Sequence, residues 1–342
     1  MTTIERIHAT GILRIGSPGR GFRYRRSGGG KITQSDLARI RRLRIPPAWT
    51  EVAINSAEAG RVQVVGKDAA GRWQYLYHET HIRERERKKF LRLIKFAEAL
   101  PVMRRAVNRD IRNTGLGKER VLAGIARILM MSFLRPGSEV YASEHGSYGL
   151  ATLRPRHVSV KGRTVTFQFR GKSGVPHVTQ FEDRQVSRLI RALLKVPNRR
   201  VFKYQNGEGK LVDVKAQTIN AYIQEMMGAH FSAKDFRTWS GTLLCACSLA
   251  RRRNDDSDHE RSVKRMIVAA VKETAKALGN TPAVCRSAYI CPAVLTAFEE
   301  DKTISDYFES LKELMSHKGP SLHPAERALV RLLKKEISGT GS

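Results

Sequence analysis

The N-terminal part of the chain alternates between apolar and polar positions over short stretches. Segments such as "IPPAWTEVAI" (45–54) and "RVQVVGKDAAGRWQYLYH" (61–78) place every second side chain on one face, as β-strands do, and turn-forming residues separate them. One stretch with helical spacing, 35–43, interrupts this pattern, and Ser35 is its expected N-cap. The pattern predicts a small β-rich domain over residues 1–80.

From His81 onward, apolar residues recur every three or four positions, which is typical of amphipathic helices. The longest apolar stretch, 121–134, is interrupted by Arg127 and is shorter than the roughly 20 residues of a membrane span, so we interpret it as a buried helix. Residues 157–181 alternate again and predict three antiparallel strands, with turns at 161–162 and 171–174.

These patterns predict an α+β fold in which the β-rich domain precedes a larger, mainly α-helical domain that carries a small antiparallel sheet. We place this larger domain at residues 81–320 and a C-terminal tail at 321–342. The first 16 residues lack the apolar run and cleavage site of a signal peptide. We therefore expect the protein to stay in the cytoplasm, associated with the nucleoid if the cell is bacterial.

Charge indicates the kind of partner. The chain has 62 Lys and Arg residues against 32 Asp and Glu, a formal net charge of +30, and the excess is spread over both predicted domains. Self-repulsion on this scale disfavours a compact protein unless a polyanion neutralises it. Nucleic acid is therefore the expected partner, and a membrane is not.

The cysteines do not predict a metal site. Cys245, Cys247, Cys285 and Cys291 form no C-x-x-C pair, and they lie in stretches with helical spacing. We expect them to be small core residues, with neither zinc nor a disulfide framework.

Polar residues stand at several places where the local pattern does not require them. Arg135 follows the long apolar stretch and precedes a Pro-Gly pair, Lys172 occupies the predicted turn "RGKSG", and Arg237 lies in the apolar start of a helix. Asn280 and Tyr289 flank a helix that we expect to begin with Thr281 as N-cap and Pro282 at its first position, after Gly279 ends the preceding one. Taken singly, these residues have ordinary interpretations as a helix cap, a solvated loop, a surface ion pair and a packing tyrosine.

Taken together, the chain resembles the type IB DNA topoisomerase family in its compact bacterial and poxvirus form. The resemblance runs from about residue 21 to residue 298, and it is carried by the blocks "GFRY", "RIPPAWTEV", "GRWQYLYH", "LRPGSEVYASEHGSYGLATLRPRHV", "FRGKSG", "AKDFRTWSGT" and "LGNTPAVCRSAYICPAVL". So many matching blocks in one order are far more specific than a single short motif. The resemblance implies a catalytic domain like that of tyrosine recombinases.

The resemblance also implies roles for individual residues. Tyr289 is the implied nucleophile, Arg135 and Arg237 hold the scissile phosphate, and Lys172 is the general acid. Such chemistry suits these residue types, because guanidinium groups present forked donors to phosphate oxygens and a lysine can protonate a leaving alkoxide.

Two further positions complete the implied site. Lys234 matches a family lysine that assists the active site. Asn280 stands where many relatives have histidine; its amide can donate a hydrogen bond to a nonbridging oxygen but carries no charge. No metal or nucleotide cofactor is implied, and "GKS" (171–173) is not the end of a P-loop, because Thr166 stands where that motif requires glycine.

In the N-terminal domain, the segment "QYLY" matches the family segment that meets DNA on the face opposite the catalytic domain. We therefore assign Gln74, Tyr75 and Tyr77 to DNA contact, and half-buried packing is an equal alternative for Tyr77. Tyr75 and Tyr77 are spaced to share one face of a strand. The two basic domains are expected to close as a monomeric clamp around duplex DNA.

Two rival functions remain open at this point. Tyrosine recombinases share the plan of two arginines, a lysine and a tyrosine, but they usually have histidine three residues before the second arginine, where this chain has Lys234. They also lack the β-rich N-terminal domain. A non-enzymatic DNA-binding protein with a decayed site is the other alternative.

Overall fold

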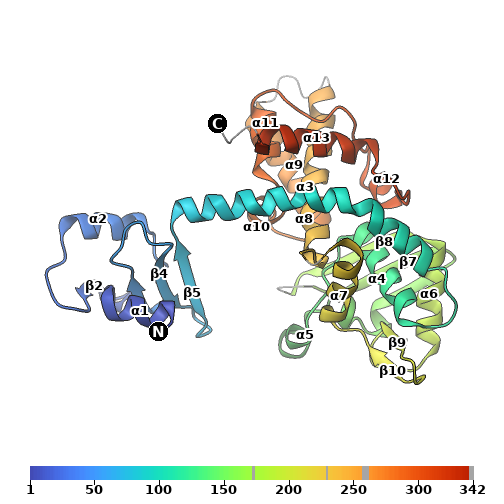
Figure 1. Ribbon diagram of the computed structural model, residues 1–342, viewed down its shortest axis with the longest axis horizontal. Helices are drawn as coiled ribbons and strands as arrows, with labels where there is room; N and C mark the ends of the chain where they lie inside the picture. Colours follow the sequence, from blue (N-terminus) through green and yellow to red (C-terminus); the bar gives the residue numbers. More distant parts are fainter. Residues whose placement is uncertain (172–173, 229, 256–261, 339–342) are drawn as a thin grey trace. The chain divides into compact units, whose positions relative to one another are not determined.

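The computed structural model describes residues 1–171, 174–228, 230–255 and 262–338. The chain divides into two compact units, Met1–Lys89 and Phe90–Ser342 (Figure 1). Helix α3 (Glu79–Asp110) runs across this division, and each unit has its own hydrophobic core. The N-terminal antiparallel sheet and the mainly helical larger unit confirm the predicted α+β class.

The first unit is a five-stranded antiparallel sheet with one helix on each face. The strand order is β2-β1-β3-β4-β5. Ile7 of α1 packs with Ala53 of β3, whereas Ile40 of α2 packs with the next residue, Ile54. Because successive residues of a strand point to opposite faces, the two helices cover opposite faces of the sheet. The elements are α1 (Thr3–Thr10), β1 (Ile12–Ser17), β2 (Gly21–Arg26), α2 (Gln34–Arg42), β3 (Thr50–Ile54), β4 (Val62–Lys67) and β5 (Trp73–Tyr77).

Helix α2 begins one residue earlier than predicted, and its N-cap is Thr33 rather than Ser35. The Thr33 hydroxyl accepts a hydrogen bond from the Asp36 N–H at 3.0 Å, and the Asp36 carboxylate accepts one from the Thr33 N–H at 2.9 Å. This reciprocal pair satisfies two otherwise unpaired donors of the first turn. Ser35 has no such partner, because Ala38 stands three residues after it.

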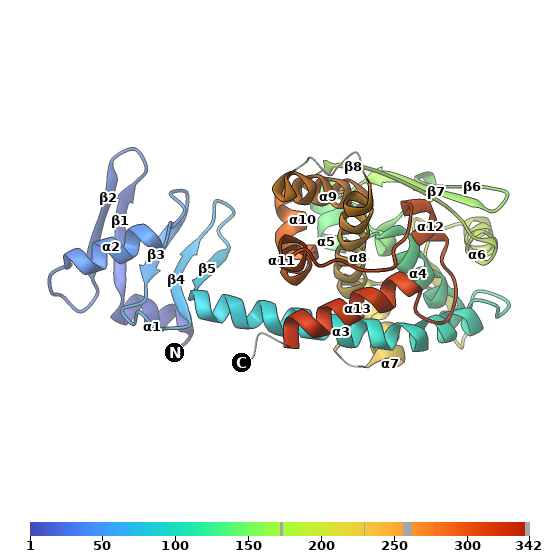
Figure 2. The same cartoon turned by 90° about the horizontal axis from the view of Figure 1, so that it is seen from above.

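The second unit is mainly helical. Besides most of α3, it contains α4 (Lys118–Ser132), α5 (Glu139–His145), two short 3-10 helices (Leu150–Thr152 and Pro155–His157), β6 (Val158–Lys161), β7 (Thr164–Arg170), β8 (Pro176–Glu182), α6 (Arg184–Lys195), β9 (Lys203–Gln205), β10 (Leu211–Asp213), α7 (Ala216–Met227), α8 (Ala233–Asn254), α9 (Val263–Leu278), α10 (Pro282–Tyr289), α11 (Pro292–Glu299), α12 (Leu311–Ser316) and α13 (Pro324–Ser338). Figure 2 shows α8 among α9, α11 and α13, and most of its residues are buried. This helix therefore runs through the core of the unit.

The small antiparallel sheet predicted within the larger domain is present as β6-β7-β8. Its first turn lies at 162–163, one residue later than predicted, and Gly162 adopts a φ of +56°. Strands β7 and β8 pair from Thr164 with Glu182 to Arg170 with Pro176. The second predicted turn, at 171–174, contains residues 172 and 173, which lie outside the described residues.

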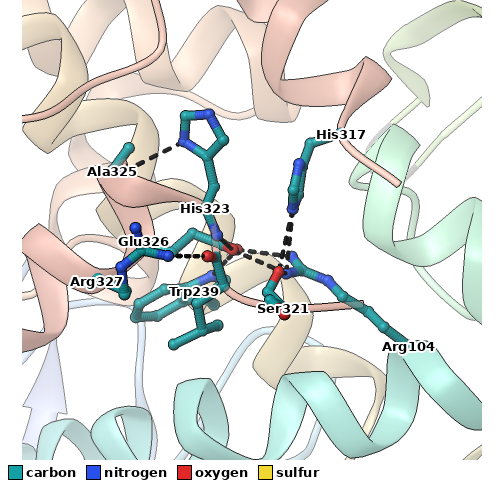
Figure 3. Close-up of polar contacts among 9 residues, drawn as sticks. Arg104, Trp239, His317, Ser321, His323, Ala325, Glu326 and Arg327 are labelled. Atoms are coloured by element: carbon teal, nitrogen blue, oxygen red, sulfur yellow. Dashed lines mark hydrogen bonds and ion pairs between the residues drawn. The ribbon is translucent and has the colours of Figure 1, made fainter. Parts of the chain in front are cut away.

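Residues 321–342, expected as a tail, contain helix α13, which packs into the second unit. Ala325, Leu329 and Leu333 recur every four positions and are fully buried. The carboxylate of Glu326 in α13 accepts two hydrogen bonds from the Arg104 guanidinium of α3, at 2.7 and 2.8 Å, and one from the Trp239 indole N–H of α8, at 3.3 Å (Figure 3). The C-terminal helix is thereby joined to the helix that carries Arg237.

All four cysteines are buried, as predicted, and their thiols are free. Burial raises the pKa of Cys247 and the pKa of Cys285 to about 11 each, so both are protonated at neutral pH. Among the described residues, no helix has the length and apolar character needed to cross a membrane. Within the same part of the chain, no group of three or more His, Cys, Asp or Glu residues is arranged to hold a metal ion.

Candidate active site

Tyr289 is placed by a sharp junction between two helices. Helix α9 ends at Gly279, whose φ of +61° is the left-handed conformation that favours glycine. Thr281 caps α10 and Pro282 occupies its first turn, both as predicted. Tyr289 is therefore the last residue of a helix only two turns long, and its direction is set by this junction.

The backbone of Tyr289 is held against α8. The Thr242 hydroxyl donates to the Tyr289 carbonyl at 3.2 Å and accepts from the Cys291 N–H at 3.1 Å. Gly241 allows this close approach, because a Cβ there would lie 2.7 Å from the same carbonyl oxygen. Helix α8 thus anchors the tyrosine and, one turn earlier, supplies Arg237.

Arg237 lies beneath the tyrosine ring. Its side chain is almost completely buried, and its guanidinium carbon lies 4.9 Å from the centroid of the Tyr289 ring. Its Nη2 donates to the Leu278 carbonyl at 2.9 Å, and its Nη1 donates to the Phe133 carbonyl. The guanidinium is therefore fixed by the ends of α9 and α4.

Arg135 reaches the same place from the segment after α4. That helix ends at Phe133 in the left-handed region, and the chain then passes Gly137, which has a φ of +84° and packs against Gly149. Arg135 Nη2 donates to the Asn280 side-chain oxygen. This contact joins residues 145 positions apart and orients the Asn280 amide.

Two buried donors at this place have no hydrogen-bond partner among the described residues. They are Nε of Arg237 and Nδ2 of Asn280. Buried donors are normally paired, because an unpaired one costs the free energy of its lost hydration. An acceptor with several oxygens beside two guanidinium groups would satisfy both, and a phosphodiester has this chemistry.

The charges around Tyr289 favour its phenolate. Burial raises the pKa of the phenol, but the positive charges of Arg237 and Arg135 oppose burial, and the net pKa lies below the ordinary value for tyrosine. Burial, followed by repulsion from Arg135, lowers the pKa of Arg237 to about 10. Arg237 is therefore still a cation at neutral pH.

The structure thus brings together four of the six predicted catalytic residues: Arg135, Arg237, Asn280 and Tyr289. Lys172 lies outside the described residues. Lys234 is exposed on α8, and its side chain forms no hydrogen bond or ion pair with the residues that the structure describes.

The predicted DNA-contact residues divide between two faces of the first unit's sheet. The Tyr75 and Tyr77 rings stack, with centroids 6.1 Å apart, and the Arg85 guanidinium lies 5.3 Å from the centroid of Tyr77. Gln74, one residue before Tyr75, points to the other face, where its amide donates to Asp68 at 2.8 Å. The tyrosine pair leaves Tyr75 exposed.

One polar residue of the site was missed in the sequence. His177, in β8, lines a cavity of about 20 Å³ together with Arg135, Arg237, Gly279 and a set of mainly apolar neighbours: Leu134, Tyr148, Phe169, Gly171 and Val175. The signal was present in "GKSGVPH", because the strand after the predicted turn places His177 opposite Phe169, near the turn. The predicted turn indicated only Lys172 as a site residue.

Comparison with known proteins identifies matching families for both parts of the chain. Residues 78–316 match the family described as eukaryotic DNA topoisomerase I, catalytic core, and residues 21–68 match the family described as bacterial DNA topoisomerase IB, N-terminal domain. A protein named DNA topoisomerase 1B from Acanthamoeba polyphaga mimivirus is 34% identical over 277 residues, which cover 79% of this chain and 82% of that protein. Another of the same name from Vaccinia virus (strain Copenhagen) is 25% identical over 288 residues, or 80% of this chain and 87% of the relative.

The match also extends to a longer protein. A DNA topoisomerase 1 from Mycosarcoma maydis is 22% identical over 227 residues, which are 58% of this chain but 22% of that protein. The catalytic-core match covers more than half of the chain, and the mimivirus relative aligns with most of it. The chain belongs to the type IB DNA topoisomerase family.

Proposed function

We propose that this topoisomerase relaxes supercoiled duplex DNA by cutting one strand, letting it rotate and resealing it. The observation that supports the cutting step is the phenol of Tyr289 beside two guanidinium groups, with the buried Arg237 Nε and Asn280 Nδ2 unpaired. A scissile phosphodiester would supply acceptors for these donors. The same position would hold its phosphorus atom near the phenolic oxygen.

In the proposed cleavage step, the Tyr289 oxygen attacks phosphorus and forms a 3′-phosphotyrosine bond as the bond to the 5′-oxygen breaks. Negative charge grows on the nonbridging oxygens, where Arg135, Arg237 and the Asn280 amide stabilise it. The phenol gives its proton to solvent water, which the lowered pKa of Tyr289 facilitates. Because the phosphodiester is exchanged for a phosphotyrosine ester, resealing needs no nucleotide, and no step here calls for a metal ion.

Lys172 is the proposed general acid. An alkoxide is a poor leaving group, so a proton given to the 5′-oxygen accelerates its departure. Resealing reverses the step: the 5′-hydroxyl attacks phosphorus, Lys172 takes its proton and the Tyr289 oxygen leaves. Lys234 is proposed to assist the site as a further cation near the bound backbone.

We expect Lys172→Ala to slow cleavage of ordinary DNA by about 10²- to 10⁴-fold, the range of a general acid. With a 5′-bridging sulfur at the scissile position, the thiolate leaves without a proton, so the variant should cleave at close to the wild-type rate. Single-turnover cleavage of both substrates measures this. Lys161→Ala, at the exposed end of β6, is the matched control. A variant that stays equally slow with the sulfur substrate removes Lys172 from the acid role.

Residues 1–80 are proposed to form a DNA-clamp domain, with residues 81–320 as the catalytic domain. The stacked pair Tyr75 and Tyr77 offers an aromatic surface flanked by Arg85. Gln74 belongs to this contact only when its amide leaves Asp68. Phosphate contacts are expected to dominate the affinity, given the net charge of +30, and binding should weaken steeply with salt.

We also propose that the protein acts as a monomer in the cytoplasm, on the nucleoid if the cell is bacterial. A single chain contains all the proposed catalytic residues. The four reduced, buried cysteines are compatible with a reducing compartment.

The decisive experiment uses a supercoiled plasmid without recombination sites, in buffer that contains EDTA and no ATP. The expected result is complete relaxation through a ladder of intermediates. Stopping the reaction with detergent should trap protein on the 3′ end of a nicked strand. Plasmid that remains supercoiled, with no trapped protein, overturns the proposal; trapped protein without relaxation favours a recombinase, and binding alone favours a non-enzymatic protein.

A further inference from the structure

A histidine outside the predicted catalytic set lies at the proposed phosphate position. His177 lines the same small cavity as Arg135 and Arg237. The volume of this cavity, about 20 Å³, is enough for one oxygen-sized group. His177 comes from β8, whereas the arginines come from α8 and the segment after α4. Three separate parts of the fold therefore each place a polar side chain at one cavity.

The ring of His177 is held in place on one side and open on the other. It packs edge-on against Phe169, with ring centroids 5.3 Å apart, and its Nε2 lies 3.3 Å from the Thr179 hydroxyl. Its Nδ1 has no hydrogen-bond partner among the residues that the structure describes. A Cβ at Gly279 would lie 3.1 Å from Nδ1, so the absence of a side chain there leaves this ring edge uncovered.

The surroundings keep His177 neutral. Burial, followed by the positive charges of Arg237 and Arg135, lowers its pKa to about 4. A neutral imidazole has one N–H and one lone pair. When the Thr179 hydroxyl donates to Nε2, the ring proton is on Nδ1, at the uncovered edge.

We propose that His177 is a further catalytic residue, whose Nδ1–H donates a hydrogen bond to a nonbridging oxygen of the scissile phosphate. This proposal rests on the proposed function. A neutral donor adds to the stabilisation of the growing charge without placing a third cation beside two buried guanidinium groups. Thr179 acts as a positioning residue, because its hydroxyl holds Nε2 and, as a donor, leaves the ring proton on Nδ1.

Two substitutions of His177 distinguish the effect of its hydrogen-bond donor from the effect of its aromatic ring. His177→Phe keeps an aromatic ring against Phe169 but removes the donor, and His177→Asn places an amide nitrogen close to the position of Nδ1. We expect His177→Phe to slow single-turnover cleavage by about 10- to 100-fold, at or below the loss for one neutral oxyanion-hole donor, and His177→Asn to recover most of the rate. Val178→Phe, at the next residue of β8, is the matched control, because Val178 is 64% exposed.

A substrate with one nonbridging oxygen replaced by methyl distinguishes contact from a structural effect. If His177 donates to that oxygen, the ratio of wild-type to His177→Phe rates should fall toward one for one methylphosphonate stereoisomer and stay high for the other. A wild-type rate for His177→Phe on ordinary DNA overturns the proposal. So does an equal loss on all three substrates, which would mean that the ring only packs.

These outcomes are separate from failure of the proposed function. If the wild-type protein forms no covalent complex with any substrate, the proposed function fails before His177 is tested. If the wild-type protein cleaves normally and only the His177 comparison fails, the function stands and the histidine role does not. Thermal melting of both variants checks that the fold survives, and His177→Asn keeps the comparison usable if His177→Phe does not fold.

Discussion

Tyr289→Phe is expected to abolish DNA relaxation and covalent attachment, with a loss of at least about 10⁴-fold in cleavage, as for removal of other enzymatic nucleophiles. The substitution removes one oxygen atom and keeps the ring over Arg237, which lies 4.9 Å from the ring centroid. Duplex binding should therefore stay within about threefold of wild type, because most of the affinity comes from phosphate contacts elsewhere. Plasmid relaxation, detergent trapping and a filter-binding titration measure the three quantities.

Tyr307→Phe is the matched control for this substitution. Its hydroxyl accepts a hydrogen bond from Asn254 at 3.1 Å, on the exposed side of the second unit. We expect it to relax plasmid at the wild-type rate. Full relaxation by Tyr289→Phe would show that another group attacks the phosphate, and the assignment of the nucleophile would be wrong.

Arg237→Ala should reduce the cleavage rate by about 10³-fold or more, since it removes a charged donor from the site of growing charge. It also leaves the carbonyls of Phe133 and Leu278 without their donor. Each such loss costs about 1–3 kcal/mol of stability in a buried site. The loss of rate must therefore be separated from a loss of fold.

The Arg237→Lys variant separates a loss of cleavage rate from a loss of fold. Lysine keeps the positive charge but lacks the forked donors, so the variant should fold and still cleave far more slowly than wild type. The pH profile is the second readout. Arg237 lowers the pKa of Tyr289, so its removal in Arg237→Ala should raise that pKa and move the rise of cleavage rate to higher pH. An unchanged profile together with near-wild-type cleavage by Arg237→Lys contradicts a direct role at the phosphate.

Local features of the fold were predictable from the sequence. The predicted junction from Gly279 to Pro282 is confirmed. It could be predicted because a helix stop, an N-cap and a first-turn proline are signals that lie within a few residues of each other. The strands of the β6-β7-β8 sheet followed from alternation alone. The N-cap of α2 was wrong by two positions, because the choice between Thr33 and Ser35 depends on which hydroxyl has a carboxylate three residues later.

The chemistry of the site was only partly predictable. The family resemblance predicted Arg135, Arg237, Asn280 and Tyr289 as site residues. No local pattern indicates that two of them, Arg237 and Asn280, have buried donors without a hydrogen-bond partner. His177 was missed because Arg135 and Arg237, which line the same cavity, come from other elements of the fold. No local sequence pattern indicates that the three residues meet. Gln74 illustrates the same limit, since its bond to Asp68 is made across a turn and on the face opposite Tyr75.

From the amino-acid sequence alone we predicted the class of fold, the positions of most helices and strands, a polyanionic partner and the residues that resemble a topoisomerase site. These properties depend on composition and on residues that are close along the chain. Which of those residues meet depends on how the chain packs, because Arg135 and Asn280 are 145 positions apart and contact each other through the packing of α4, α8 and α9. The lowered pKa of Tyr289 and the uncovered edge of His177 arise from the same packing, since burial and neighbouring charge exist only in the folded chain.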